Sequence, residues 1–177
     1  MVPTELAWAA GFVDGEGHVT VRKKNATWRV RGSKHTGRPR MEGTTYAVEL
    51  TVTNRNPTPM RMLALLFGGD YVPSYRTGRK NTYYKWRLGS DQAVYALELM
   101  LPFLVGKREL ATTAISFHHW YKSTAPKAGE GMPAERRAHA ETYHQTCKAL
   151  IARYRSAPGA DMVKESPELR VVAGGSM

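Results

Sequence analysis

The chain has 177 residues, 42% of them hydrophobic, which is enough for one domain with its own core. Its 26 Lys and Arg against 15 Asp and Glu give a formal charge of +11 and a pI near 10.0, favouring a polyanionic partner such as nucleic acid. One cysteine, Cys147, excludes an internal disulfide and a two-cysteine zinc site. No long apolar run or secretion signal is present, so a soluble, intracellular protein is expected.

The pattern of apolar residues predicts nine elements in chain order. Thr4 and Gly15 are typical of the two ends of a helix at 5–14. Alternating side chains predict two hairpins, and helical patterns separate and follow them. The hairpins comprise strands at 18–31 with 47–54 and at 70–75 with 83–88, and the later helices lie at 58–67, 91–101, 107–123 and 134–155.

This order predicts an α+β fold, in which helices back one face of a four-stranded antiparallel sheet and leave the other face free. Additional helices follow the αββαββα core. We expect one domain over residues 1–155 and a polar, partly disordered tail over residues 156–177.

The positive charge lies in the hairpins. Residues 22–87 hold 15 Lys and Arg against three acids, whereas the rest of the chain holds 11 against 12. The polar strand face and the basic loops are therefore predicted to bind nucleic acid, and duplex DNA fits better than RNA because an A-form major groove is too narrow for a ribbon. The predicted DNA-binding residues are His18, Thr20, Arg22, Lys24, Arg29, Arg31, Lys34, Arg38, Arg40, Glu49, Thr51, Thr53, Tyr75, Arg76, Arg79, Lys80, Tyr83, Lys85 and Arg87.

The first helix ends in two carboxylates among glycines. A helix C-terminus is partly negative, so Asp14 and Glu16 are unfavourable there unless a cation compensates. Bound Mg²⁺ would do so, with Glu16 and the Gly15 carbonyl as ligands. On the same helix, Ala7, Ala10 and Gly11 form a small-residue face that could admit a second helix or pack on the chain's own core.

The stretch "LAWAAGFVDGEG" resembles the motif of LAGLIDADG homing endonucleases, and the element order, the basic strands and "LPFLVGKRE" resemble their single-motif, homodimeric members. The resemblance covers about residues 4–155. It implies that two motif helices pack together through Ala7, Ala10 and Gly11. It further implies a pair of chains that cuts both strands of a long, pseudo-palindromic DNA site, leaves short 3′ overhangs and is intron-encoded.

The resemblance also implies roles for single residues. Glu16 matches the acid that binds the divalent metal, which is Mg²⁺ or Mn²⁺, with Ca²⁺ supporting binding without cleavage. Asp14 matches a supporting acid rather than a ligand. Lys107 matches the active-site lysine, and Asn54 occupies the place of a residue that positions water. No arginine falls in register with the family's, since Arg55 and Arg61 both lie outside it.

Two other functions remain open on the same scaffold: a DNA-binding regulator that does not cleave, and an intron maturase that binds RNA. Glu16 together with Lys107 favours cleavage over the regulator. Residue usage rich in Ala, Gly and Arg favours the cytoplasm of a bacterium, an archaeon or a phage-infected cell over an organelle.

Overall fold

The computed structural model describes residues 1–28, 41–74, 83–126 and 131–156. In chain order the elements are α1 (Pro3–Glu16), β1 (Gly17–Trp28), β2 (Met41–Asn54), α2 (Pro57–Phe67), β3 (Asp70–Ser74), β4 (Tyr83–Gly89), α3 (Ser90–Met100), α4 (Arg108–Ser123) and α5 (Ala134–Ser156). The predicted order of elements is confirmed. The predicted tail, 156–177, lies outside the described residues except for Ser156, which is the last residue of α5. No described helix has the length and apolar character needed to cross a membrane.

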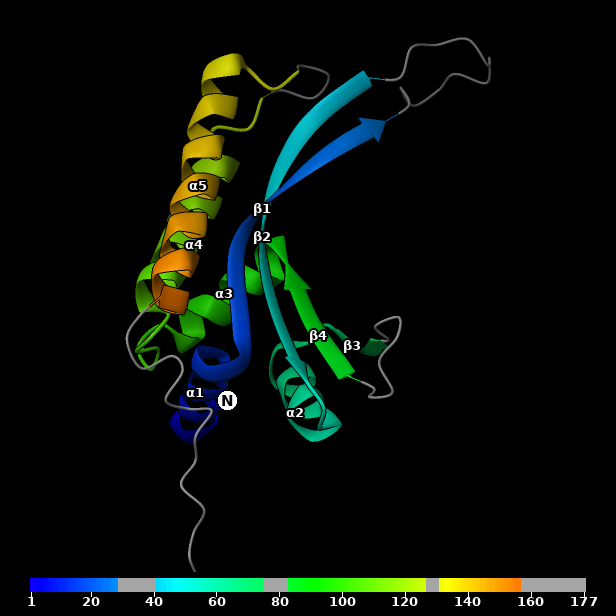
Figure 1. The fold of residues 1–177 in the computed structure, drawn as a ribbon, viewed down its shortest axis with the longest axis vertical. Helices are drawn as coiled ribbons and strands as arrows, with labels where there is room; N and C mark the ends of the chain where they lie inside the picture. Colours follow the sequence, from blue (N-terminus) through cyan, green and yellow to red (C-terminus); the bar gives the residue numbers. More distant parts are fainter. Residues whose placement is uncertain (29–40, 75–82, 127–130, 157–177) are drawn as a thin grey trace, which may run out of the picture.

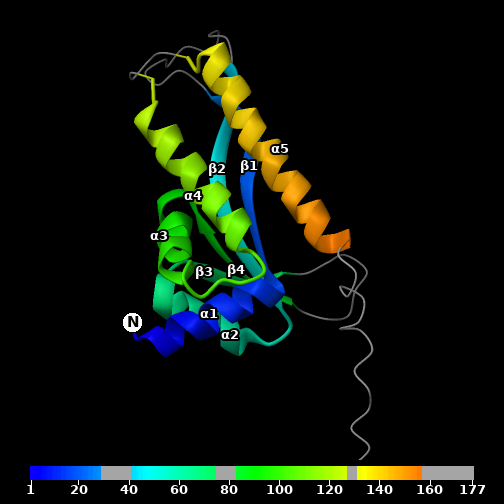
Figure 2. The ribbon, with the colours of Figure 1, turned by 90° about the vertical axis from the view of Figure 1, so that its left-hand side faces the viewer.

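The four strands form one antiparallel sheet in the order β1-β2-β4-β3. β1 and β2 make a long hairpin that rises beyond the rest of the sheet (Figure 1). Seen from the side of the helices, α1, α3, α4 and α5 lie in front of the strands (Figure 2). The helices thus cover one face, and the opposite face, which we call the open face, is left uncovered by any described element.

Strand alternation separates the two faces. Val19 and Val21 of β1, Leu50 and Val52 of β2, and Trp86 of β4 are fully buried on the helix side. The residues between them along each strand therefore point to the open face. The expected α+β fold, with helices backing a four-stranded antiparallel sheet, is confirmed.

The turn after α2 depends on glycine and on a tryptophan hydrogen bond. Gly68 and Gly69 have φ values of +74° and +80°, which other residues rarely adopt. The indole N–H of Trp86 donates to the Gly68 carbonyl oxygen at 2.9 Å. The indole N–H is the one polar group of the Trp86 ring. Because it is hydrogen-bonded, the ring is fully buried under β4 without an unpaired donor.

Two predicted ends of α1 were wrong by a few residues. The helix starts at Pro3, where the Glu5 carboxylate accepts from the Val2 backbone N–H at 2.9 Å, and Thr4 is not the cap. At the other end the helix continues through Gly15 to Glu16. Both acids therefore belong to the last turn of α1 rather than to a loop after it.

Candidate functional site

Glu16 is placed by the direct passage from α1 into β1. The Gly17 N–H donates to the Val13 carbonyl oxygen, and a Cβ built on Gly17 would lie 2.5 Å from that oxygen. Only glycine allows this close approach, so the chain turns from helix to strand without a loop. The exposed Glu16 side chain stands at the turn, and it has no hydrogen bond or ion pair to any residue that the structure describes.

Asp14, two residues earlier, is fully engaged. Its carboxylate accepts hydrogen bonds from the backbone N–H groups of Val105 at 2.7 Å, Gly106 at 3.2 Å and Lys107 at 2.8 Å. These donors precede α4, so the carboxylate lies at the positive N-terminal end of that helix. Asp14 therefore needs no metal ion to offset its position in α1, and of the two acids only Glu16 keeps its oxygens available.

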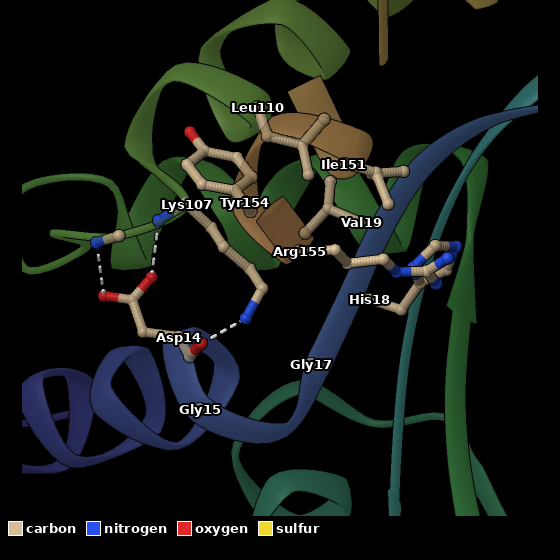
Figure 3. A pocket seen from close by; sticks show the side chains of 11 residues that line it. Asp14, Gly15, Gly17, His18, Val19, Lys107, Leu110, Ile151, Tyr154 and Arg155 are labelled. Atoms are coloured by element: carbon tan, nitrogen blue, oxygen red, sulfur yellow. Dashed lines mark hydrogen bonds between the residues drawn. The ribbon is translucent and has the colours of Figure 1, made fainter. Parts of the chain in front are cut away.

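Lys107 supplies a cation to the C-terminus of α1. Its ammonium group donates to the Val13 carbonyl oxygen at 3.0 Å and to the Asp14 carbonyl oxygen. Burial lowers the pKa of Lys107, and the charges of Asp14 and Glu16 act in the opposite direction. Figure 3 shows the lysine side chain descending from the start of α4 onto the end of α1. The structure thus brings together Glu16, Asp14 and Lys107, which the sequence pointed to separately.

A pocket of about 630 Å³ opens beside this junction. Its walls come from α1, β1, α4 and the C-terminal end of α5 (Figure 3). Lining residues include Asp14, Gly15, His18, Lys107, Tyr154 and Arg155.

Arg155 and Tyr154 were missed by the sequence analysis. The Arg155 side chain extends from α5 toward the His18 ring (Figure 3). Burial lowers the pKa of His18, and the charge of Arg155 lowers it further, so the imidazole is neutral near pH 7. The only sequence signal was helical spacing, since Arg155 follows the half-buried Ile151 by one turn of α5.

The open face carries the described part of the predicted DNA-binding set. Alternation places His18, Thr20, Arg22, Lys24, Glu49, Thr51, Thr53, Tyr83, Lys85 and Arg87 on this face. His18 lies opposite Thr51, which lies opposite Arg87, so one row runs across three strands from the pocket. Predicted residues that lie outside the described ranges are Arg29, Arg31, Lys34, Arg38, Arg40, Tyr75, Arg76, Arg79 and Lys80.

Three predicted residues have other surroundings than the sequence suggested. Asn54 shares the helix-side parity of Val52, and its side-chain oxygen accepts from the Asn56 backbone N–H at 2.9 Å, so it belongs to the turn into α2. Ala10 is fully buried in the chain's own core, whereas Ala7 and Gly11 are exposed. Glu49 is only 9% exposed and pairs with two arginines, which removes it from direct contact with a ligand.

The donors at the end of α1 fit a magnesium ion. Glu16 offers a carboxylate without a partner among the described residues, and Gly15, which borders the pocket, offers a carbonyl oxygen. No cluster of three or more His, Cys, Asp or Glu in the described ranges could hold a metal by itself. Mg²⁺ commonly takes only one or two carboxylates, with water and phosphate as its other ligands. The residues therefore fit an ion that also binds a phosphate or a second copy's carboxylate.

The comparison with solved structures identifies the fold, and the other two comparisons find nothing. No protein-family model matches the sequence, and a comparison with curated proteins finds no match. Solved structures do match. The homing endonuclease I-CvuI in complex with DNA is 18% identical, with a TM-score of 0.58 over 83% of this chain and 82% of its own.

Two further homing endonucleases give similar values. An archaeal intron-encoded enzyme complexed with DNA is 14% identical, with a TM-score of 0.59 over 83% of this chain and 84% of its own. I-TnaI is 18% identical, with a TM-score of 0.52 over 85% and 97%. The chain therefore has the fold of the homing endonucleases, as the likeness of α1 to the LAGLIDADG motif implied.

Proposed function

We propose that two copies of this chain form a metal-dependent endonuclease, which makes a double-strand break with short 3′ overhangs in a long, pseudo-palindromic DNA site. The observation that carries the proposal is the Glu16 carboxylate, which has no hydrogen bond or ion pair to the described residues and lies beside the Lys107 ammonium group where the open cationic face begins. I-CvuI and the archaeal intron-encoded enzyme, which share the fold, were solved with DNA, and I-CvuI also with magnesium or calcium. An intron-encoded origin belongs to the same proposal.

DNA binding is supported by the shape and charge of the open face. Arg22 of β1 and Lys85 and Arg87 of β4 lie on either side of β2 and point the same way. A twisted antiparallel ribbon fits the major groove, where arginine and lysine donate to guanine acceptors. His18, which lines the pocket, belongs to this face and lies two residues after Glu16, so a duplex seated on the strands would pass close to Glu16.

In the proposed reaction water attacks the scissile phosphorus in line, the bond to the 3′ oxygen breaks, and the products are a 5′ phosphate and a 3′ hydroxyl. Mg²⁺ held by Glu16, with the Gly15 carbonyl nearby, would polarise the phosphate and activate the water. Lys107 places a positive charge where negative charge builds on the phosphate. Asp14 acts indirectly, because its three backbone hydrogen bonds fix the start of α4 and hence Lys107.

Arg155 and His18 add a second polar wall to the same pocket. The guanidinium group of Arg155 can contact a phosphate oxygen, and the neutral His18 can hold a water by one hydrogen bond. Arg155→Ala should slow cleavage about tenfold or more if this contact forms, since charge-assisted bonds contribute on the order of 1.5–3 kcal/mol. An unchanged rate would exclude Arg155 from the site.

Cleavage of sites selected from a random-sequence plasmid library tests the function. The wild-type protein should make double-strand breaks that require Mg²⁺ and stop with chelator. Glu16→Gln should bind the same sites and leave them intact, a loss of about 10³-fold or more, because the residue with free carboxylate oxygens is removed. Equal cutting by both proteins would remove Glu16 from the mechanism, and binding without cutting by the wild type would favour the regulator.

The dimer can be tested through α1. A Cβ built on Gly11 meets nothing within 4 Å, so the isolated chain tolerates a larger residue there. Alanine in a helix interior stabilises by about 1 kcal/mol relative to glycine. We expect Gly11→Ala to keep or raise the melting temperature, and Gly11→Leu to abolish both dimer and cleavage, as measured by sedimentation and plasmid nicking. A Gly11→Leu protein that remains dimeric and active would place the second copy elsewhere.

A further inference from the structure

A buried carboxylate lies at the centre of the open face beneath two arginines. Glu49 of β2 is 9% exposed. Its Oε2 accepts from Arg22 Nη1 of β1 at 2.8 Å and from Arg87 Nη2 of β4 at 2.5 Å. Three strands thus contribute one residue each to a cluster that we call the Arg-Glu-Arg triad.

The register of the sheet explains why the three side chains meet. Glu49 pairs with Thr20 on one side and with Gly89 on the other. Arg22 and Arg87 each lie two residues from those partners, at positions diagonal to Glu49 and on opposite sides of it. Diagonal neighbours on one face are within reach of long side chains. The two arginines therefore converge on one oxygen from different heights along the sheet.

The triad leaves most of the arginine donors unused. Each guanidinium has five N–H groups, and one is committed to Glu49 in each case. The Arg22 and Arg87 side chains remain 44% and 45% exposed. Burial by itself would raise the pKa of Glu49, but the two arginines outweigh it and the pKa lies below the usual range. The carboxylate is thus ionised, and both bonds are charge-assisted.

We propose that Glu49 is a positioning residue for sequence specificity, which holds Arg22 and Arg87 so that their free donors meet the acceptor edges of two guanines. The proposal rests on the proposed binding of duplex DNA. Arginine donates in a bidentate manner to guanine O6 and N7, and a side chain ordered in advance loses less rotamer freedom on binding. An arginine without such a partner pairs as readily with phosphate, which adds affinity but no sequence information.

Selection of bound duplexes from a random-sequence library tests this role, with wild type, Glu49→Gln, Arg22→Ala and Arg87→Ala compared. Wild type should prefer guanine at two positions of each half-site, and each Arg→Ala variant should lose one of them. Glu49→Gln should weaken both preferences together, by about tenfold. Its affinity for random duplex should stay equal or rise, because a negative charge is removed from the face.

The matched control is Glu141→Gln. Glu141 also pairs with a cation, Lys23 at 2.8 Å, but on the helix side of the sheet. The control should select the same sequences as wild type. If Glu49→Gln keeps both guanine preferences, or loses preference at positions that neither arginine controls, the inference is wrong.

Two further outcomes can be distinguished: a Glu49→Gln protein that does not fold, and a wild-type protein that selects no sequence. Should Glu49→Gln fail to fold, Arg22→Lys carries the test, since it keeps a cation beside Glu49 but lacks the planar fork. It should then lose the Arg22 guanine and retain the Arg87 guanine, and retention of both would overturn the proposal. If wild type enriches no sequence from the library, the proposed DNA-binding function fails instead.

Discussion

The junction of α1, β1 and α4 and the open face of the sheet are built in opposite ways. At the junction the contacts involve main chain: Asp14 accepts from three backbone N–H groups, Gly17 approaches the Val13 carbonyl, and Lys107 donates to backbone oxygens. On the open face, the contacts of the Arg-Glu-Arg triad are between side chains. The proposed chemistry is therefore tied to the fold itself, whereas the proposed recognition can change by substitution without altering it.

The two acids of α1 show the same contrast within one turn of helix. The carboxylate oxygens of Asp14 accept hydrogen bonds from the backbone, whereas those of Glu16 accept none from any described residue. Removing Asp14 should therefore cost stability, and removing Glu16 should cost activity alone.

The largest expected effect on stability comes from Asp14→Asn. An amide presents only one acceptor oxygen. With that oxygen in the place of Oδ2, the bond from the Lys107 N–H is lost, and the bonds from Val105 and Gly106 are no longer charge-assisted. We expect the free energy of unfolding to fall by about 3 kcal/mol, since such bonds contribute on the order of 1.5–3 kcal/mol each. Urea unfolding followed by circular dichroism measures it.

Glu16→Gln is the matched control in the same titration. An exposed residue without partners changes stability by no more than about 0.5 kcal/mol. Equal destabilisation by the two substitutions would contradict the contrast between the acids.

Gly17→Ala tests the main-chain contacts at the junction of α1 and β1. The added Cβ would lie 2.5 Å from the Val13 carbonyl oxygen and 2.9 Å from its Cα, neither of which can move without bending α1. Overpacking of this kind costs about 1–3 kcal/mol, and the bend would also displace Glu16. Thermal unfolding together with a cleavage assay should show both losses.

Gly15→Ala is its control, because a Cβ there meets nothing within 4 Å. It should unfold at or above the wild-type temperature. A Gly17→Ala protein with wild-type stability would mean that the passage from α1 to β1 adapts freely.

The sequence predicted those features that depend on periodicity. Alternation in β1, β2 and β4 was enough to assign the open face, and the Gly68-Gly69 pair was enough to end α2. Asn54 ends β2, where the sequence placed it, but its side-chain oxygen accepts from the Asn56 N–H in the turn that follows. Strand periodicity carries no information about such a turn.

Residue spacing in the sequence could not predict contacts between distant segments. Spacing alone could not show that Ala10 faces the core while Ala7 does not, because both lie on the small-residue side of α1. Nor could it show that Arg155, about 140 residues after Asp14, shares a pocket with it. The pairing of Glu49 with Arg22 and Arg87 likewise depends on the register of three strands.

The smallest expected effect on stability concerns a contact between side chains on the helix side of the sheet. This contact involves no backbone hydrogen bond and no proposed ligand. Glu141 of α5 accepts from Tyr46 at 2.6 Å and pairs with Lys23 at 2.8 Å. The Lys23 and Tyr46 hydrogen bonds lower the pKa of Glu141 to about 2. About a third of the side chain stays exposed, so solvent screens the pair and about 1 kcal/mol is expected at neutral pH.

The sign follows from the lowered pKa. An unfolded glutamate titrates near pH 4.3, so the stabilisation is complete above about pH 5 and is lost as the pH falls toward 2. Glu141→Gln should therefore be less stable than wild type at pH 7, and the two melting curves should converge by about pH 2. A difference in melting temperature that stayed constant over this range would mean that α5 is held to the β1–β2 hairpin by packing alone, and that charge on the helix side, unlike charge on the open face, is incidental.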